Sequence, residues 1–148
     1  MARRTLAGGA ITILLADDHE ALRGTLRRML ESHDDLLVVA EASDGFGAVE
    51  LAKRYHPDVA VVDIGMKEMN GIEATAHLRR DTPETAVLIL TVHFNERFVV
   101  RAIEAGARGY LLKDCLDEEE FVLAIHTLRA GGRFFSSAVA ASVPPGFS

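Results

Sequence analysis

Short apolar runs alternate along the chain with longer segments that carry apolar residues on one helical face. In the segment 19–32, for example, the apolar residues Leu22, Leu26, Met29 and Leu30 recur at helical spacing. Such alternation indicates a parallel sheet covered by helices on both faces. The predicted strands are residues 11–16, 36–40, 58–62, 86–90 and 110–112.

The helical segments end at residues that interrupt a helix. Pro57 follows the second helix, Gly106 is suited to a left-handed cap after the fourth, and Gly131 and Gly132 follow the last. Five strand–helix units favour an open sheet over a barrel, which needs eight units and about 250 residues. The predicted fold class is α/β, a flavodoxin-like (βα)5 three-layer sandwich with a parallel sheet of order 2-1-3-4-5. The predicted helices are 19–32, one around 48–55, 72–80, 96–105 and one around 121–128.

The length of 148 residues fits one globular domain. Residues 1–10 include two arginines and two glycines and are expected to form a flexible leader rather than a signal peptide. Residues 11–132 contain all the periodic segments and form the predicted domain. Residues 133–148 are expected to be a linker or tail, either a short helix or a frayed end.

Composition excludes several classes of function. A net charge of −6 leaves no basic field with which this chain could hold nucleic acid nonspecifically. The single cysteine, Cys115, excludes an internal disulfide and agrees with a cytoplasmic location. No apolar run approaches the roughly 20 residues that cross a bilayer, so no membrane association is expected.

Polar residues close four of the predicted strands: Asp17 and Asp18 the first, Asp63 the third, Thr91 the fourth and Lys113 the fifth. Each has an ordinary explanation as a helix cap, a turn residue or a surface charge. The carboxyl ends of parallel strands share one edge, however, so the five residues are expected to gather there. Three carboxylates opposite one lysine need a further positive charge, and oxygen ligands favour Mg²⁺ or Mn²⁺ over zinc.

A cation, a lysine, a hydroxyl and an aspartate at one edge are the groups that phosphoryl transfer uses. Carboxylates form acyl phosphates, so Asp63 is the predicted nucleophile.

From about residue 11 to residue 136 the chain resembles the response-regulator receiver family. The segment 106–114, together with Gly131, Gly132 and Arg133, is most similar to the subgroup joined to a LuxR-type helix-turn-helix domain. The segments that carry the resemblance are 14–20, 57–64, 69–71 and 106–114.

The resemblance implies a phosphoacceptor switch rather than an enzyme, with at most Mg²⁺-dependent self-phosphorylation and slow autodephosphorylation. Asp63 would accept phosphate from the phosphohistidine of a sensor histidine kinase. Asp17, Asp18 and Asp63 would hold Mg²⁺, and Gly65 would add a backbone carbonyl.

The resemblance also implies a route from the phosphoryl group to the output. Thr91 and Lys113 would bind the phosphoryl oxygens, and Tyr110 would move with Thr91 as a switch residue. The alternative for Tyr110 is a half-buried strand aromatic with a solvated hydroxyl. Phosphorylation would promote homodimerisation, and DNA would be bound only through an output domain that residues 133–148 are too short to form.

Two rival functions are weighed against this one. A phosphatase of the haloacid-dehalogenase type needs a second aspartate two residues after the nucleophile, where this chain has Gly65. A receiver that works without phosphate is disfavoured by the intact set of site residues. Lys67 replaces the usual proline of the loop after Asp63, and His93 stands with Gly65 at positions that vary among receivers, so the lifetime of the phosphoryl group is left open.

Overall fold

Strands and helices alternate through the chain as the hydrophobic pattern predicts. The computed structural model describes residues 9–146. The five predicted strands and the helices predicted at 19–32, 72–80 and 96–105 lie within two residues of their predicted bounds, whereas the helices expected around 48–55 and 121–128 each begin three residues earlier. The elements are β1 (Ile11–Ala16), α1 (Glu20–Glu31), β2 (Leu36–Ala42), α2 (Gly45–Tyr55), β3 (Val59–Val62), α3 (Gly71–Asp81), β4 (Ala86–Thr91), α4 (Glu96–Ala105), β5 (Gly109–Leu112), a short 3-10 helix (Lys113–Cys115), α5 (Glu118–Arg129), β6 (Phe134–Phe135) and α6 (Ser137–Ala140).

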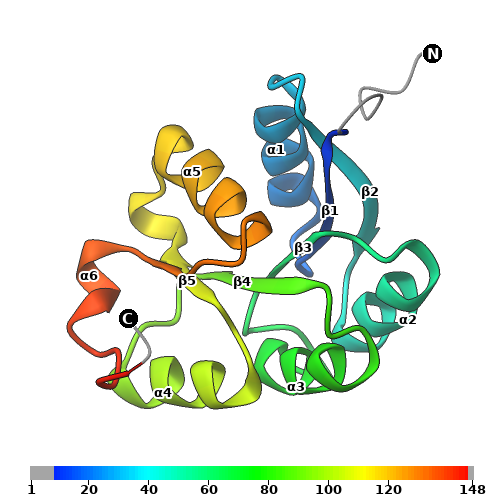
Figure 1. Cartoon of the computed structure of the whole chain (residues 1–148). Coiled ribbons are helices and arrows are strands. Elements are labelled where there is room, and N and C mark those ends of the chain that lie inside the picture. The colour runs from blue at the N-terminus through cyan, green and yellow to red at the C-terminus, as the bar shows by residue number, and fades with distance from the viewer. Residues whose placement is uncertain (1–8, 147–148) are drawn as a thin grey trace.

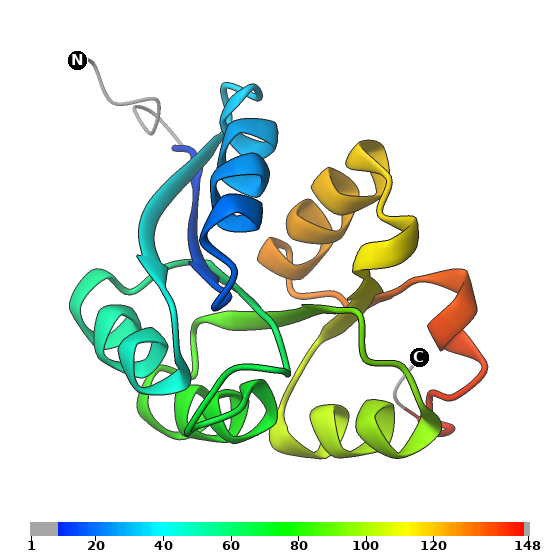
Figure 2. The same ribbon diagram turned by 180° about the vertical axis from the view of Figure 1, so that it is seen from behind.

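The strands form one parallel sheet in the order β2-β1-β3-β4-β5-β6. Helices α1 and α5 cover one face, while α2, α3 and α4 cover the other (Figures 1 and 2). This three-layer arrangement confirms the flavodoxin-like prediction and the order 2-1-3-4-5, to which β6 is added at the edge.

Alternate residues of β1 point into different core layers, as the two-residue period of a strand requires. Ile13 and Leu15 pack with the residues of α1 and α5, whereas Leu14 and Ala16 pack with those of α2, α3 and α4. All four side chains are at most 2% exposed. Since both faces of the strand are buried, the next polar residue, Asp17, is held at a fixed point by a fully packed strand.

The ends of the helices follow ordinary capping rules. Asn70 and Glu73 form a capping box at the start of α3. Gly106 ends α4 with φ of 117°, which confirms the predicted left-handed cap. Among residues 9–146, no helix is both long and apolar enough to cross a membrane.

The C-terminal segment contributes to the sheet and the core, whereas residues 133–148 were expected to be a linker or tail. The short helix α6 agrees with one of the two expected alternatives, but the strand β6 was not predicted. Phe134 and Phe135 pair with Gly109 and Tyr110 of β5, and Val139 of α6 is fully buried. A strand of two residues has no periodicity to read, because only its pairing with β5 defines it. Most of the predicted leader, residues 1–8, lies outside the described part of the chain.

Gly71 allows α3 to begin directly against the backbone that carries Asp63. A methyl group at this position would overlap the carbonyl oxygen of Asp63 and lie 2.8 Å from the Cα of Ile64. We therefore expect Gly71→Ala to lower the free energy of unfolding in urea by about 1–3 kcal/mol.

Gly24→Ala is the matched control, because Gly24 lies in α1 and an added methyl would meet only the end of the Arg28 side chain, at 3.4 Å. Helix propensity should make this variant more stable by about 0.5–1 kcal/mol. Equal effects of the two substitutions would show that the close approach of α3 to Asp63 is not the constraint.

Candidate functional site

Four strands deliver the predicted site residues to one edge of the sheet. Asp17 and Asp63 directly follow β1 and β3, Thr91 is the last residue of β4, and Lys113 follows β5. The backbone ladder continues past the strand ends, since Asp63 N donates to Ala16 O at 3.0 Å. The acidic residues are therefore fixed at the backbone by the sheet itself.

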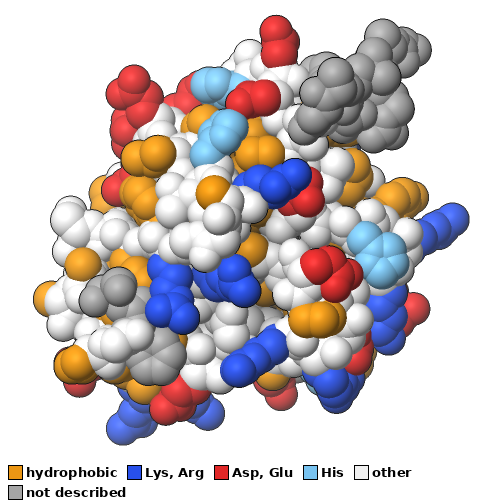
Figure 3. Space-filling model, viewed as in Figure 1, with side chains coloured by type: hydrophobic (Ala, Val, Ile, Leu, Met, Phe, Trp, Pro, Cys, Tyr) orange, Lys and Arg blue, Asp and Glu red, His pale blue; other side chains and the backbone are white. Residues whose placement is uncertain are grey.

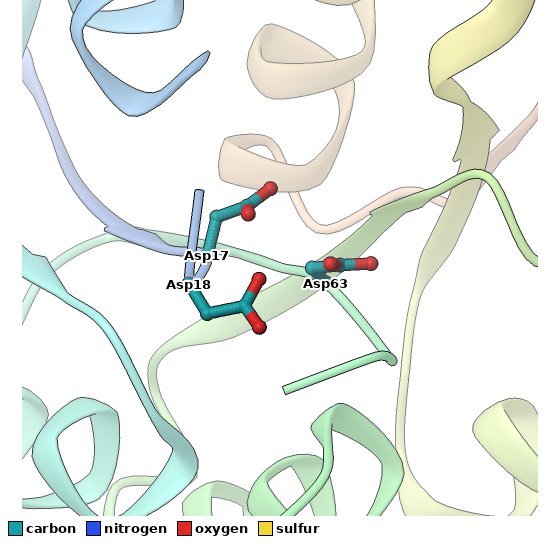
Figure 4. Close-up of side chains that lie close together, drawn as sticks. All are labelled: Asp17, Asp18 and Asp63. Atoms are coloured by element: carbon teal, nitrogen blue, oxygen red, sulfur yellow. The ribbon is translucent and has the colours of Figure 1, made fainter. Parts of the chain in front are cut away.

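Asp17, Asp18 and Asp63 form a cluster of three carboxylates (Figure 4). One oxygen from each lies within 4.8 Å of the others. Asp17 and Asp63 are only 4% and 7% exposed, whereas Asp18 is exposed to solvent. The cluster thus has two buried members and one at the entrance.

Lys113 provides the positive charge that faces this cluster. Its Nζ lies 2.5 Å from Asp17 Oδ2 and 3.2 Å from Asp63 Oδ2, and its side chain is 14% exposed. Burial alone would lower the pKa of Lys113, but the hydrogen bond to Asp17 and the charge of Asp63 outweigh it and raise the pKa above its usual value. Lys113 is therefore firmly protonated and bridges two carboxylates from different strands.

One lysine does not balance three carboxylates. At a separation of about 4 Å two such charges repel by about 4 kcal/mol at an effective dielectric near 20. Asp63 Oδ1 is also buried without a hydrogen-bond partner among the described residues. A buried carboxylate oxygen with no donor and a surplus of negative charge are the features that a divalent cation would satisfy, and the all-oxygen donor set fits Mg²⁺ or Mn²⁺.

Thr91 and Tyr110 are connected through the backbone of His93. Thr91 Oγ1 accepts a hydrogen bond from His93 N at 3.2 Å, and Tyr110 Oη donates to His93 O at 2.6 Å. Both Thr91 and Tyr110 are 0% exposed. His93 joins them through its backbone atoms. The sequence does not predict this role, because no sequence pattern reports a contact made by the backbone.

In this structure Tyr110 is fully buried and its hydroxyl is hydrogen-bonded, rather than half-buried with a solvated hydroxyl. Its ring lies in the core layer that also contains Val139, and its backbone carbonyl accepts from Ser136 N at 3.2 Å. Burial and, to a smaller extent, the negative charge of Asp63 raise the pKa of the hydroxyl. Tyr110 is therefore a neutral donor held between the sheet edge and the C-terminal segment.

The loop after Asp63 is anchored on both sides of Lys67. Met66 and Met69 are 5% and 8% exposed, and Lys67 between them points to solvent. The loop is therefore held by buried methionine side chains in the absence of the usual proline.

Gly65 leaves room for the ring of His93. A methyl group at Gly65 would lie 2.8 Å from His93 Nε2 and 3.7 Å from Asp63 Oδ2. The imidazole of His93 therefore lies beside the acidic cluster, and a larger residue in place of Gly65 would displace it.

Arg23 contacts the backbone of the acidic cluster, and the sequence does not predict this contact. Its Nη1 donates to Asp17 O at 2.6 Å and its Nε pairs with Glu41 at 3.1 Å. In the sequence Arg23 is one of several polar residues on α1, and nothing distinguishes it from a solvated one.

The sequence matches one known family over most of its length. Residues 13–126 match the response regulator receiver domain. The chain is 39% identical over 124 residues to the transcriptional regulatory protein DegU of Brevibacillus brevis, an alignment covering 84% of this chain and 52% of DegU. It is 38% identical over 128 residues to the nitrate/nitrite response regulator protein NarL of Escherichia coli K12, covering 86% and 59%. The chain thus spans little more than half the length of these curated relatives.

Solved structures give the same result. A two-component response regulator of the LuxR family from Aurantimonas superposes with a TM-score of 0.85 at 38% identity, covering 90% of this chain and 95% of that one. The signal receiver domain of a NarL protein from Mycobacterium tuberculosis gives 0.79 at 35% identity, covering 83% and 98%. The chain therefore belongs to the response regulator receiver family, within the LuxR-type group of two-component regulators.

Proposed function

We propose that this chain is a phosphorylation-controlled switch in which Asp63 accepts a phosphoryl group from the phosphohistidine of a sensor histidine kinase. Receiver domains are signalling switches rather than enzymes in the usual sense. The observation that carries the proposal is the environment of Asp63: one carboxylate oxygen faces Lys113, and the other is buried with no donor among the residues that the structure describes.

In the proposed transfer, a carboxylate oxygen of Asp63 forms a bond to phosphorus while the bond between phosphorus and the histidine nitrogen breaks. The electron pair of the broken bond returns to the imidazole, and Asp63 becomes an acyl phosphate. Because the transition state carries charge on the equatorial oxygens, the contribution of the protein is mainly to position groups and stabilise charge.

We assign the divalent cation to Asp17, Asp18 and Asp63, with the backbone carbonyl of Gly65 as a further oxygen ligand. Receiver domains generally bind Mg²⁺ at such an acidic cluster. When bound, Mg²⁺ (or Mn²⁺) supplies positive charge to the phosphoryl oxygens. The exposed position of Asp18 agrees with a cation that enters from solvent.

Lys113 and Thr91 are the proposed partners of the phosphoryl oxygens, and Tyr110 is the proposed relay. Lys113 already contacts Asp63, so its ammonium group lies where negative charge would be added. A Thr91 hydroxyl drawn toward the phosphoryl group would weaken its bond to His93 N, and His93 O is the acceptor of Tyr110. This connected path supports a joint response of the two buried residues.

The proposed output is homodimerisation and control of a DNA-binding domain that follows residues 133–148. The relatives DegU and NarL are named as a transcriptional regulatory protein and a response regulator, and both extend well beyond the matched region. A transcriptional role of this type implies a cytoplasmic protein. We place the receiver in residues 11–132 and propose that residues 133–148, of which β6 and α6 pack onto it, also form the connection toward the output domain.

Acetyl phosphate with Mg²⁺ should add the mass of one phosphoryl group to the chain, because Asp63 is the proposed acceptor. Intact-mass spectrometry measures the gain, which Asp63→Asn should abolish. Asp114→Asn is the matched control, since Asp114 is exposed next to Lys113 and outside the cluster. A wild-type chain of unchanged mass, or a phosphorylated Asp63→Asn variant, would sink the proposal.

Mg²⁺ should raise the thermal stability of the metal-free protein. At about ten times Kd, binding to the folded state alone contributes about 1.4 kcal/mol. Asp18→Asn should weaken this response without unfolding the protein, because Asp18 is exposed and no hydrogen bond to its side chain is seen among residues 9–146. Calorimetric melts with and without Mg²⁺ measure the shift, and an equal shift in wild type and Asp18→Asn would count against the assigned ligands.

Phosphorylation should promote self-association. Sedimentation velocity with beryllofluoride and Mg²⁺ is expected to show a larger dimer fraction than the untreated protein. The Asp63→Asn variant should sediment alike under both conditions. If wild type also shows no difference, phosphorylation does not control dimerisation in this chain.

A further inference from the structure

A hollow of about 440 Å³ lies at the edge of the sheet opposite to Asp63. It is formed where α3 and α4 end and where β4, β5 and β6 begin. Since the strands are parallel, their amino ends lie a full strand length away from the acidic cluster at their carboxyl ends. The hollow is therefore separate from the site described above.

Three arginines from three different segments line this hollow, which we call the arginine hollow: Arg79 from α3, Arg108 from the turn before β5, and Arg133 from the turn before β6. Glu104 is the one carboxylate among the residues that line the hollow. Figure 3 shows Lys and Arg side chains grouped on the face between α3, α4 and the C-terminal segment. Such a grouping of arginines is unusual in a chain whose net charge is −6.

Two of these arginines have defined positions at the hollow, Arg108 through its backbone hydrogen bonds and Arg79 through the path of its side chain. Arg108 lies between β4 and β6, because its N donates to Val87 O at 2.9 Å and its O accepts from Phe134 N at 3.0 Å. The Arg79 side chain crosses Gly106, where a methyl group would lie 2.7 Å from Arg79 Cδ. Glycine at this position thus serves both the left-handed cap and the path of the arginine.

Arg79 and Arg108 keep their charge available. Within residues 9–146, neither forms an ion pair with a carboxylate, whereas the neighbouring Arg80 pairs with Asp81 at 2.9 Å. Arg79 Nη1 donates to the backbone carbonyl of Glu104 at 3.1 Å, which orients the guanidinium. Its other N–H groups form no hydrogen bond with the described residues and can bind a ligand. An oriented Arg79 guanidinium and a second arginine at a fixed backbone position, Arg108, are suited to the recognition of an anion.

We propose that the arginine hollow binds a small phosphate monoester. A phosphate monoester carries about −1.5 to −2 charges at neutral pH, so it can balance both Arg79 and Arg108, whereas a single carboxylate balances only one of them. Guanidinium forks bind phosphate through paired hydrogen bonds. Val87 and Ile103 also line the hollow and offer apolar contact to the organic part of the ligand, and the volume lies in the range of small-molecule sites, about 300–1,000 Å³.

The probe is adenosine 5′-monophosphate, titrated into the full chain in metal-free buffer at fixed ionic strength and followed by NMR amide shifts. We expect saturable shifts at Gly106 and Arg108, with adenosine at the same concentrations producing none. Arg108→Ala and Arg79→Gln should each raise Kd at least about tenfold, because each removes charge-assisted hydrogen bonds. Arg80→Ala should change Kd by less than about twofold, since Arg80 lies on the same helix outside the hollow.

Circular dichroism melts establish that each variant is folded, and two variants on different segments keep the test decisive if one is not. Absence of saturable shifts overturns the proposal, as does equal weakening by Arg80→Ala. Shifts that adenosine reproduces would show an apolar site instead. Loss of binding in Asp63→Asn would place the ligand at the acidic cluster, and tighter binding of a polyglutamate peptide would assign the hollow to an acidic protein partner.

Discussion

Three carboxylates held opposite one ammonium group are the constraint on which the rest of this structure depends. Asp17 and Asp63 are buried, and Lys113 contacts both, yet the cluster keeps an excess of negative charge and one buried oxygen without a donor. Such an arrangement is unfavourable by itself and becomes favourable when a cation supplies positive charge. We therefore propose that a bound cation balances the cluster, and that it does so all the more when a phosphoryl group adds further negative charge.

The fold sustains this imbalance by fixing the backbone rather than by neutralising the charge. Strands buried on both faces end at the acidic residues, and α3 begins against the carbonyl of Asp63 because Gly71 has no side chain. We propose that a change in charge at the cluster acts on the rest of the domain through a short path of hydrogen bonds. Thr91, His93 and Tyr110 are joined by two hydrogen bonds, and Tyr110 in turn supports the strand pairing of the C-terminal segment.

Most of the fold was predictable because its strands and helices each produce a local periodicity of apolar residues in the sequence. The apolar strands, the helix that ends at Gly106 and the convergence of Asp17, Asp63 and Lys113 all follow from patterns within a few residues and from the rule for parallel strand ends. Features that depend on distant partners were not predictable. β6 exists only as a neighbour of β5, His93 acts through its backbone atoms, and the arginine hollow combines residues from three separate segments, so none of them leaves a local signal in the sequence.

A double-mutant cycle between Lys113 and Asp63, measured as free energies of unfolding in metal-free buffer, tests the central role of this charge balance most directly. Lys113→Met alone should be destabilising, because it leaves buried carboxylates without their counter-charge. Adding Asp63→Asn should recover part of the loss, with a coupling energy of about 1–3 kcal/mol. Strictly additive effects of the two substitutions would contradict the account, since they would show that the lysine does not hold the acidic cluster together.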